Sequence, residues 1–281
     1  QGGRVAEKLG ARILGLGAFT KVVGDAGITV ASRLKIPVTT GNSYTVATAI
    51  EATREAARVM GHDLKDASLV IMGATGAIGR VCALVLAREA RRITLVARNE
   101  RKLEELAVKI LYDTGLAVKV TSGSKKALQT ADVVITVTSS IDTVIEPEDL
   151  KSGAVVCDVA RPRDVSRRVA EVRDDVLVIE GGVVEVPGDV EFNLNFGFPP
   201  RTAYACMAET MVLALEQRYE SYTLGRELTV EQVEEIAQLA KKHGFKLSGF
   251  RSFGKAMTEK EIAGIRSRAS EQKIARPCQI K

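Results

Sequence analysis

The chain has 281 residues, of which 46% are hydrophobic and 27% charged, and its formal net charge is +5. These values are ordinary for a globular protein of one or two domains with a large core. No apolar run approaches the roughly 18 to 20 residues of a membrane span, and the mild basic excess lacks the clusters with aromatic residues typical of nucleic-acid binding, so we expect neither class.

The first third of the chain predicts a short strand, an extended arm and a helix. The apolar, glycine-rich segment Ala11–Thr20 favours a buried strand followed by a tight loop, and Ile36–Ser43 favours a strand or extended arm that ends in a turn. Helical spacing of apolar residues predicts a helix over Tyr44–Met60, with Asn42 or Ser43 as its cap.

A glycine-rich turn between two short apolar runs is the feature around which the fold is predicted. Ser68–Met72 and Ile93–Ala97 have strand length, and Arg80–Ala90 has helical spacing. The turn lets the backbone approach a pyrophosphate, which the N–H groups of the new helix attract. A tight turn that needs small residues for packing is the structural alternative. The predicted cofactor-binding residues here are Gly73, Ala74, Thr75, Gly76, Ala77, Ile78 and Gly79.

The end of the second predicted strand indicates which dinucleotide binds. NAD-selective sites usually place Asp or Glu there to bind the ribose 2′-hydroxyl, but this chain has Ala97-Arg98-Asn99. Arg98 offers a planar set of donors to a 2′-phosphate, with Asn99 and Arg101 as further candidates. We therefore predict an NADP(H) site.

The alternation of strands and helices continues to about residue 180. Helices are predicted over Arg101–Leu111 and Ser124–Gln129, and strands over Leu116–Val120, Asp132–Val137, Ala154–Asp158 and Val176–Ile179. Six such strands predict an α/β fold with a doubly wound parallel sheet of Rossmann type. Ligands of these sheets bind at the carboxyl ends of the strands, which adds further candidates for cofactor binding: Val137, Thr138, Ser139, Asp158, Gly181 and Gly182.

A long irregular loop is predicted over Gly181–Pro200, and a helix over Arg201–Tyr222 with Met207, Met211, Leu215, Tyr219 and Tyr222 as its core stripe. Thr229 caps a further helix that ends at His243-Gly244, and an amphipathic helix is expected over Glu259–Glu271. We expect residues 61–200 to form an NADP(H)-binding domain, and residues 1–60 with 201–281 to form a smaller substrate-binding and catalytic domain.

The cysteines and histidines are few and scattered. None has C-x-x-C spacing, so we expect no metal site, no disulfide framework and a reducing, cytoplasmic location: Cys82, Cys157, Cys206, Cys278, His62 and His243. Because the chain begins with Gln1 rather than Met, the sequence leaves open a preceding leader or domain.

Cys206 is the candidate nucleophile. It lies in the first turns of a predicted helix and off its apolar stripe, where the helix dipole favours the thiolate. The structural alternative is a small buried hydrophobic residue, as expected for Cys82 and Cys157, whereas Cys278 has no assigned role.

Six segments of the sequence together resemble one enzyme family. They are TTGNSYT (39–45), GATGAIG (73–79), VARNERKLEEL (96–106), GGVVE (181–185), YACMAETM (204–211) and LGRELTVEQVEEIAQLAKKHGF (224–245). Their order is similar to that in the cyanobacterial long-chain fatty acyl-[acyl-carrier-protein] reductases, and the resemblance covers about residues 11–245. The GGVVE and A-C-x-A-E segments are the most specific.

The resemblance implies an NADPH-dependent reduction of an acyl thioester, carried by acyl-carrier protein or CoA, to an aldehyde. Cys206 falls on the nucleophile position of the family and forms the covalent acyl-enzyme. Candidates for binding the oxyanion are Asn42, Thr40 and backbone N–H groups at the start of the 201–222 helix. Tyr44 stands where the family carries histidine, the family has an N-terminal segment that this chain lacks, and the basic tail is longer here, so carrier and chain length are left open.

Two other functions are compatible with the sequence. A shikimate-dehydrogenase-like enzyme would share the cofactor domain, but its lysine and aspartate pair is missing after Val38-Thr39-Thr40 and Asn42-Ser43. A non-catalytic NADP(H)-binding protein would bind the cofactor and form no acyl adduct. A homo-oligomer is expected from base rates alone.

Overall fold

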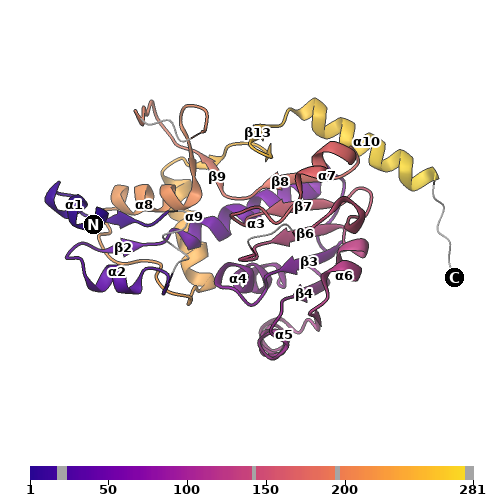
Figure 1. Cartoon of the computed structure of the whole chain (residues 1–281), viewed down its shortest axis with the longest axis horizontal. Helices are drawn as coiled ribbons and strands as arrows, with labels where there is room; N and C mark the ends of the chain where they lie inside the picture. Colours follow the sequence, from indigo (N-terminus) through magenta and orange to yellow (C-terminus); the bar gives the residue numbers. More distant parts are fainter. Residues whose placement is uncertain (18–23, 141–143, 194–196, 276–281) are drawn as a thin grey trace. The chain divides into compact units, whose positions relative to one another are not determined.

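The computed structural model describes residues 1–17, 24–140, 144–193 and 197–275 (Figure 1). These residues form two units. The sheet unit consists of Ala49–Gly181 and Gly249–Lys281, and the thiol unit, which contains Cys206, consists of Gln1–Thr48 and Gly182–Ser248.

The six-stranded parallel sheet predicted from the sequence is confirmed. Every neighbouring pair of strands is parallel, and the ladder aligns Met72 with Val96 on one side and with Thr136 on the other. The strands lie in the order β5 (Lys119–Thr121), β4 (Arg92–Val96), β3 (Ser68–Met72), β6 (Val133–Thr136), β7 (Val155–Asp158) and β8 (Leu177–Glu180). The order reverses between β3 and β6, as in the Rossmann fold, and ligands of such sheets bind at the carboxyl edge near that point.

Alternate residues of the strands build two hydrophobic faces. One face, with Val70, Val134 and Val156, packs against Leu128 and Val169 in a single buried cluster. The elements on this face are α6 (Ser124–Thr130), η2 (Pro147–Asp149) and α7 (Arg167–Val172).

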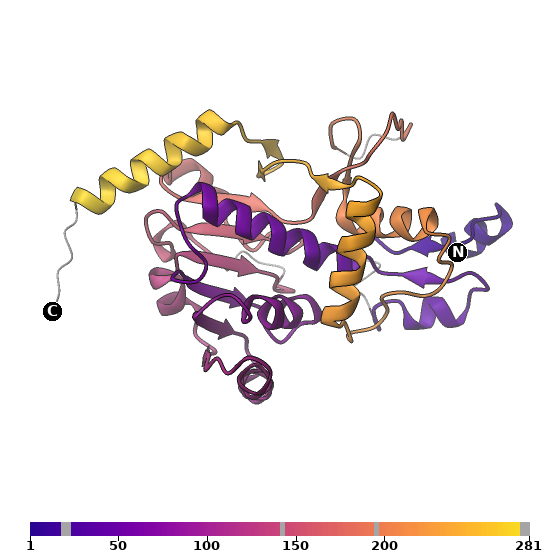
Figure 2. The same ribbon diagram turned by 180° about the vertical axis from the view of Figure 1, so that it is seen from behind.

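The opposite face is covered by α4 (Ala77–Leu86) and by the second half of α3 (Asn42–Val59), which runs in front of the strands in Figure 2. On this face Cys157 of β7 lies against the carbonyl of Ala49. The edge helix α5 (Glu100–Thr114) contacts α4 and β5. Its N-terminus is capped by Asn99, whose Oδ1 accepts the N–H of Lys102 at 3.0 Å.

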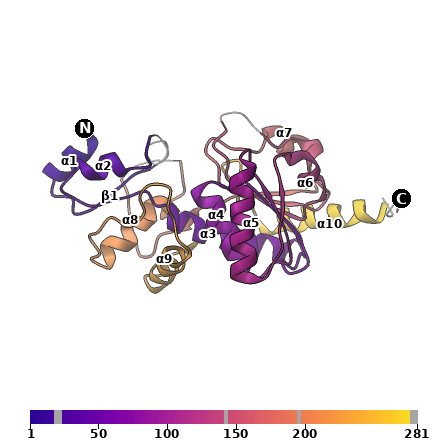
Figure 3. The same ribbon diagram turned by 90° about the horizontal axis from the view of Figure 1, so that it is seen from below.

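The thiol unit contains two small sheets and several helices. α8 and α9 lie side by side (Figure 3), and their core includes Ala208, Val212 and Ile236. The elements of the unit are α1 (Gly2–Lys8), β1 (Leu14–Gly15), α2 (Ile28–Ser32), β2 (Val38–Thr39), the first part of α3, β9 (Val183–Glu185), β10 (Thr202–Tyr204), α8 (Ala205–Leu215), α9 (Val230–Lys242) and β11 (Lys246–Leu247). β1 pairs with β2 in parallel, and β9 pairs with β10 and β11 in antiparallel.

The predicted cap of α9 is confirmed. The Thr229 hydroxyl accepts the N–H of Gln232, and the Gln232 side chain accepts the N–H of Thr229. None of the helices in the described ranges is long and apolar enough to cross a membrane.

The helix predicted over Arg201–Tyr222 is wrong at both ends. Thr202–Tyr204 forms strand β10 against β9, so α8 starts at Ala205, and α8 ends at Leu215 before Gln217 adopts a φ of 56°. The Gly181–Pro200 loop is likewise not wholly irregular, because it contains β9. The predicted stripe is right in part: Tyr222 is buried and Met211 packs against the core of the thiol unit, whereas Leu215 is 54% exposed. The buried residues of α8 are Ala205, Ala208, Glu209, Val212 and Leu213.

Two N-terminal expectations also need correction. α3 already begins at Asn42, so neither Asn42 nor Ser43 is its cap, and the Ser43 hydroxyl instead donates to Glu209 on α8. The strand expected within Ala11–Thr20 is limited to Leu14–Gly15, and residues 18–20 lie outside the described ranges.

The C-terminal segment belongs to the sheet unit, whereas the sequence grouped it with the N-terminal residues. It forms the hairpin of β12 (Arg251–Ser252) and β13 (Lys255–Ala256), followed by α10 (Glu259–Ala275), which the amphipathic pattern predicted over Glu259–Glu271. Glu180, at the carboxyl end of β8, accepts the N–H of Gly254 at 2.7 Å and the Arg163 guanidinium at 2.6 Å. This buried carboxylate holds the hairpin on the sheet.

Glu180→Ala is therefore expected to release the hairpin. Loss of its acceptor leaves the Gly254 N–H and the Arg163 guanidinium unpaired, which should lower the free energy of unfolding by about 2 kcal/mol. Urea unfolding measures this loss, and tryptic cleavage at Arg251 or Lys255 should accelerate. Glu259→Ala at the exposed start of α10 is the control, and equal cleavage rates in the two variants would contradict the assignment.

Candidate functional site

The glycine turn after β3 requires glycine at two positions for packing alone. Gly73 has a φ of 75°, and a Cβ there would lie 2.7 Å from the Val137 carbonyl oxygen. A Cβ on Gly79 would lie 2.4 Å from the Gly73 oxygen. The structural alternative therefore accounts for Gly73 and Gly79.

Gly76 is different, because a Cβ there would meet only the Gly73 oxygen at 3.3 Å. Gly76 is the N-cap of α4, and no side chain caps this helix, so its first N–H groups have no side-chain acceptor from the cap. An uncapped helix N-terminus preceded by the small residues Gly73, Ala74, Thr75 and Gly76 suits a pyrophosphate. The residues present thus fit a dinucleotide.

The turn after β4 contains the predicted residues for binding a 2′-phosphate. Arg98 is exposed, and no hydrogen bond or ion pair of its guanidinium is found among the described residues. The side chain of Asn99 caps α5, and the Arg101 guanidinium pairs with Glu105 at 2.9 Å. Of the three candidates, Arg98 is the one whose side chain is available.

The carboxyl ends of β6 and β7 are occupied by a buried network. The side chain of Asp164, which the sequence did not single out, accepts hydrogen bonds from the hydroxyl of Thr136 and from the N–H and hydroxyl of Thr138. Asp158 accepts the N–H groups of Ala160 at 3.0 Å and Val165 at 3.1 Å. The side chains of Asp158 and Thr138 thus hold the loops that border the predicted cofactor edge.

Burial raises the pKa of Asp158 from 3.8 to about 7, and the neighbouring Asp164 adds to the rise. The Val165 N–H and the Arg161 guanidinium oppose it. Near neutral pH this carboxyl group therefore takes up or releases a proton next to the cofactor edge.

The two glycines predicted after β8 lie in different units. Gly181 packs within the sheet unit, where a Cβ would come 3.1 Å from the sulfur of Cys157. Gly182 has a φ of 84° and belongs to the thiol unit, where its carbonyl accepts the N–H of Ala205 at 2.8 Å. Gly182 therefore supports the start of α8.

Cys206 is the second residue of α8, closer to the helix N-terminus than the sequence indicated, and no side chain caps this helix. It is half-buried, whereas the other two cysteines in the described ranges are fully buried. Burial raises the pKa of the Cys82 thiol and raises that of Cys157 to about 12. Among the three, only Cys206 is accessible and lies in the first turn of a helix; Cys278 lies outside the described ranges.

The loop that precedes α3 is in close contact with Cys206. A Cβ on Gly41 would lie 2.3 Å from the Cys206 Cα and 2.4 Å from its Cβ, and Gly41 has a φ of 72°. Only glycine fits there, so the chain entering α3 passes directly over the thiol residue. Asn42 follows at once; it is 8% exposed, and its Oδ1 has no hydrogen-bond partner among the described residues.

The other predicted polar groups near the thiol have structural partners. The Thr40 hydroxyl donates to Thr223, and the Thr40 N–H donates to the Thr223 carbonyl at 2.9 Å. Tyr44 is buried, with its ring in edge contact with Phe245. Asn42 and the N–H groups that follow Ala205 in the first turn of α8 are the remaining candidates for stabilising an oxyanion at Cys206.

A buried carboxylate one turn after Cys206 is the main site residue that sequence reasoning missed. Glu209 is fully buried and accepts hydrogen bonds from Thr39, Ser43, the Tyr44 N–H and Thr223. The signal was present in the A-C-x-A-E segment, because an acid on the buried face of an apolar helix needs partners from elsewhere.

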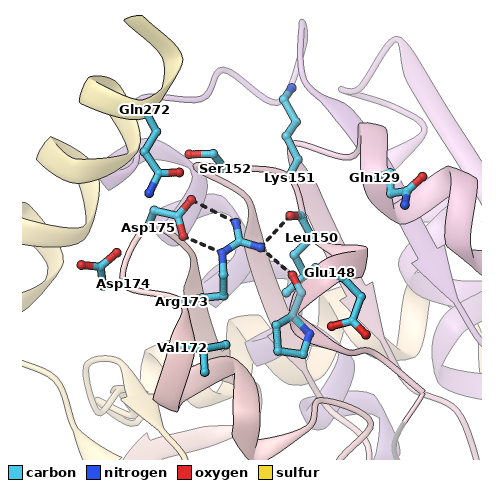
Figure 4. Close-up of a pocket in the computed structure, with 11 residues that line it drawn as sticks. Gln129, Glu148, Leu150, Lys151, Ser152, Val172, Arg173, Asp174, Asp175 and Gln272 are labelled. Atoms are coloured by element: carbon cyan, nitrogen blue, oxygen red, sulfur yellow. Dashed lines mark hydrogen bonds and ion pairs between the residues drawn. The ribbon is translucent and has the colours of Figure 1, made fainter. Parts of the chain in front are cut away.

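A cavity of about 880 Å³ lies at the amino ends of β6 to β8 in the sheet unit (Figure 4). Arg173 dominates it and uses its donors on Asp175 and on the carbonyls of Pro147 and Leu150. Because these donors are already paired, Arg173 is a structural residue that joins the turns, and the cavity offers no evident ligand site.

Comparisons with known proteins agree with the nucleotide-binding fold. The family model of shikimate / quinate 5-dehydrogenases matches residues 54–180. The aminotransferase PigE of Serratia sp. is 33% identical over 261 residues, which cover 92% of this chain and 30% of PigE. The chain thus spans less than a third of that protein. The long-chain acyl-[acyl-carrier-protein] reductase of Synechococcus elongatus is 30% identical over 256 residues, which cover 85% of this chain and 72% of that reductase.

More distant matches include the glutamyl-tRNA reductase of Cyanophora paradoxa, 27% identical over 58% of this chain and 39% of that protein. Among solved structures, the nucleotide-binding domain of glutamyl-tRNA reductase from Thermoplasma volcanium is 17% identical with a TM-score of 0.35, and the match covers 46% of this chain and 84% of that one. The sequence matches group this chain with oxidoreductases that have a nucleotide-binding domain.

The raised pKa of Asp158 predicts a pH dependence of stability. Because the folded protein holds this proton more tightly than the unfolded chain, the free energy of unfolding should fall as pH rises from about 4 to 7, by ~1.4 kcal/mol per pH unit at most. In Asp158→Asn this loss should be absent, so the decrease measured by urea unfolding between pH 5 and 8 should be about 2 kcal/mol smaller than in the unmodified protein. Asp66→Asn, at an exposed position, is the control, and parallel pH curves for all three proteins would refute the assignment.

Proposed function

We propose a function on the premise that this chain belongs to the reductase family represented by the long-chain acyl-[acyl-carrier-protein] reductase of Synechococcus elongatus. The function is the NADPH-dependent reduction of an acyl thioester to an aldehyde, with Cys206 as nucleophile. The observation that carries the proposal is the half-buried thiol at the uncapped N-terminus of α8, directly beside Gly41 and Asn42.

The reaction has two steps. The Cys206 thiolate adds to the carbonyl carbon of the thioester and expels the carrier thiolate, so that one C–S bond forms as another breaks. NADPH, when bound, supplies the hydride that reduces the acyl-cysteine carbonyl. Cleavage of the bond to Cys206 then releases the aldehyde and restores the thiolate.

The residues around Cys206 serve the oxyanion of both steps. We assign this role to the N–H groups that follow Ala205 in the first turn of α8 and to the amide of Asn42, which comes directly after the close contact of Gly41 with Cys206. Preorganised donors of this kind stabilise charge that develops in the transition state. The buried ring of Tyr44 packs against Phe245, so we assign it no proton-transfer role in place of the histidine found in the cyanobacterial enzymes.

The sheet unit provides the cofactor site. The turn from Gly73 to Ile78 and the uncapped start of α4 would hold the pyrophosphate, and Arg98 would bind the 2′-phosphate. The two parts of the chemistry thus reside in the two units of the chain.

The substrate partner follows from the relative of known activity. We propose an acyl-carrier protein or CoA as the carrier, and a reducing, cytoplasmic location in which the thiol stays free. The match to part of an aminotransferase is chemically compatible, because aldehydes are amino acceptors in transamination. A homo-oligomer stays a prediction.

A shikimate-dehydrogenase-like oxidoreductase is the second candidate, favoured by the family model over residues 54–180. The matched residues run from α3 to the end of β8 and do not include Cys206. The second candidate would leave the thiol, Gly41 and Asn42 without a role. A non-catalytic NADP(H)-binding protein has the same difficulty.

Acylation of Cys206 is the direct test. When the protein is incubated with octanoyl-CoA in the absence of NADPH, intact mass should rise by one octanoyl group, because hydride transfer cannot follow. The adduct should be lost in Cys206→Ala and retained in Cys82→Ala. No adduct with CoA or carrier-protein thioesters would refute the proposal.

Arg98 should decide cofactor preference. Arg98→Ala removes a charge-assisted contact with the 2′-phosphate, so the dissociation constant for NADPH should rise about 10- to 100-fold while that for NADH changes little. Titration of the intrinsic cofactor fluorescence measures both constants. Arg101→Ala, whose guanidinium already pairs with Glu105, should have the smaller effect, and an equal loss for both cofactors would contradict the NADP(H) assignment.

A further inference from the structure

We propose that Glu209 is a positioning residue, which fixes the segment 39–45 against the N-terminus of α8 so that Asn42 stays at the Cys206 thiol. That this positioning serves catalysis rests on the proposed function. That Glu209 fixes the segment rests on the geometry of the thiol unit alone.

The carboxylate of Glu209 joins three segments that are distant in sequence. Its Oε2 accepts the Ser43 hydroxyl and, at 3.0 Å, the Tyr44 N–H, both in the first turn of α3. Its Oε1 accepts the hydroxyls of Thr39, on β2, and, at 2.8 Å, of Thr223. Four donors thus converge on a side chain that belongs to α8.

The charge of this group is accommodated without a basic partner. No ion pair in the described part of the chain includes Glu209, and all four donor residues are buried. An isolated buried carboxylate is strongly disfavoured, but one that fills its acceptor sites with donors and faces a helix N-terminus is stabilised. An apolar residue at this position would satisfy none of these donors.

The Glu209 carboxylate is well placed to position groups at the Cys206 thiol, because both side chains belong to α8. Glu209 follows Cys206 by three residues on α8, which places the two side chains one turn apart. On one side of Asn42, Gly41 contacts the backbone of Cys206. On the other side, Ser43 and Tyr44 donate hydrogen bonds to Glu209. Asn42 is therefore fixed between two points of attachment to α8. Displacement of such a group by about 1 Å can slow a reaction about 100-fold.

The test separates positioning from folding by comparing two reactions of the same thiol. Acylation of Cys206 by octanoyl-CoA needs aligned oxyanion donors, whereas alkylation by iodoacetamide needs only access. In Glu209→Ala, acylation measured by intact mass should slow about 100-fold, and alkylation should stay within about threefold. The acylation rate of Glu209→Gln should lie between those of Glu209→Ala and the unmodified protein. The glutamine oxygen can still accept hydrogen bonds from Ser43 and Tyr44, and its NH₂ group can donate to the hydroxyls of Thr39 and Thr223.

Glu216→Gln is the matched control. Glu216 follows the same helix and pairs with Lys242 and His243, so neither rate should change. Should Glu209→Ala fail to fold, Ser43→Ala removes a single donor and should slow acylation without slowing alkylation. Equal slowing of both reactions, or acylation at the unmodified rate, would overturn the positioning role.

A separate measurement distinguishes failure of this proposal from failure of the proposed function. Amide hydrogen exchange over residues 39–45 should accelerate in Glu209→Ala and not in Glu216→Gln, whether or not the protein accepts thioesters. If the unmodified protein forms no acyl adduct but this exchange responds, the reductase function is refuted and the attachment by Glu209 stands. Unchanged exchange refutes the attachment itself.

Discussion

Close approach of backbone segments, possible only where a glycine stands, builds both candidate sites. In the sheet unit Gly73 lies against the Val137 carbonyl and Gly79 against Gly73, which sets the start of α4 directly after β3. In the thiol unit Gly41 lies against the backbone of Cys206. In each case the missing side chain leaves room for another segment at a helix N-terminus, where unpaired N–H groups can act on an anion or a thiolate.

Buried carboxylates without basic partners then stabilise the segments that meet at these glycines. Asp164 collects the hydroxyls and an N–H at the end of β6, and Glu209 collects those around the start of α3. Both accept hydrogen bonds from neutral donors, which keep the surrounding loops in one arrangement. Asp158 accepts only two backbone N–H groups through its side chain, and burial raises its pKa.

Sequence reasoning recovered the parts of the fold that depend on local pattern. β3 matches its predicted range, and the six parallel strands and the Thr229 cap follow from apolar runs and capping chemistry that are local in the chain. It missed what depends on distant partners. Thr202–Tyr204 reads as helix until β9 pairs with it, and Ser43 reads as a cap until Glu209 supplies an acceptor. Cys206 and Asn42 could be proposed from the sequence because a thiol and an amide suit the expected chemistry, whereas Glu209 and Asp164 became visible only through their contacts.

The division of the chain into two units corresponds to the extent of the dehydrogenase family match. The match to the dehydrogenase model covers residues 54–180 and so falls within the first segment of the sheet unit, Ala49–Gly181. That segment provides the sheet and the glycine turn, which any nicotinamide-dependent reaction can use. The thiol, its glycine neighbour and the carboxylate that aligns them all belong to the other unit. On the proposed function, the residues that act on the substrate lie in the thiol unit, so identity in that unit is the better guide to shared chemistry.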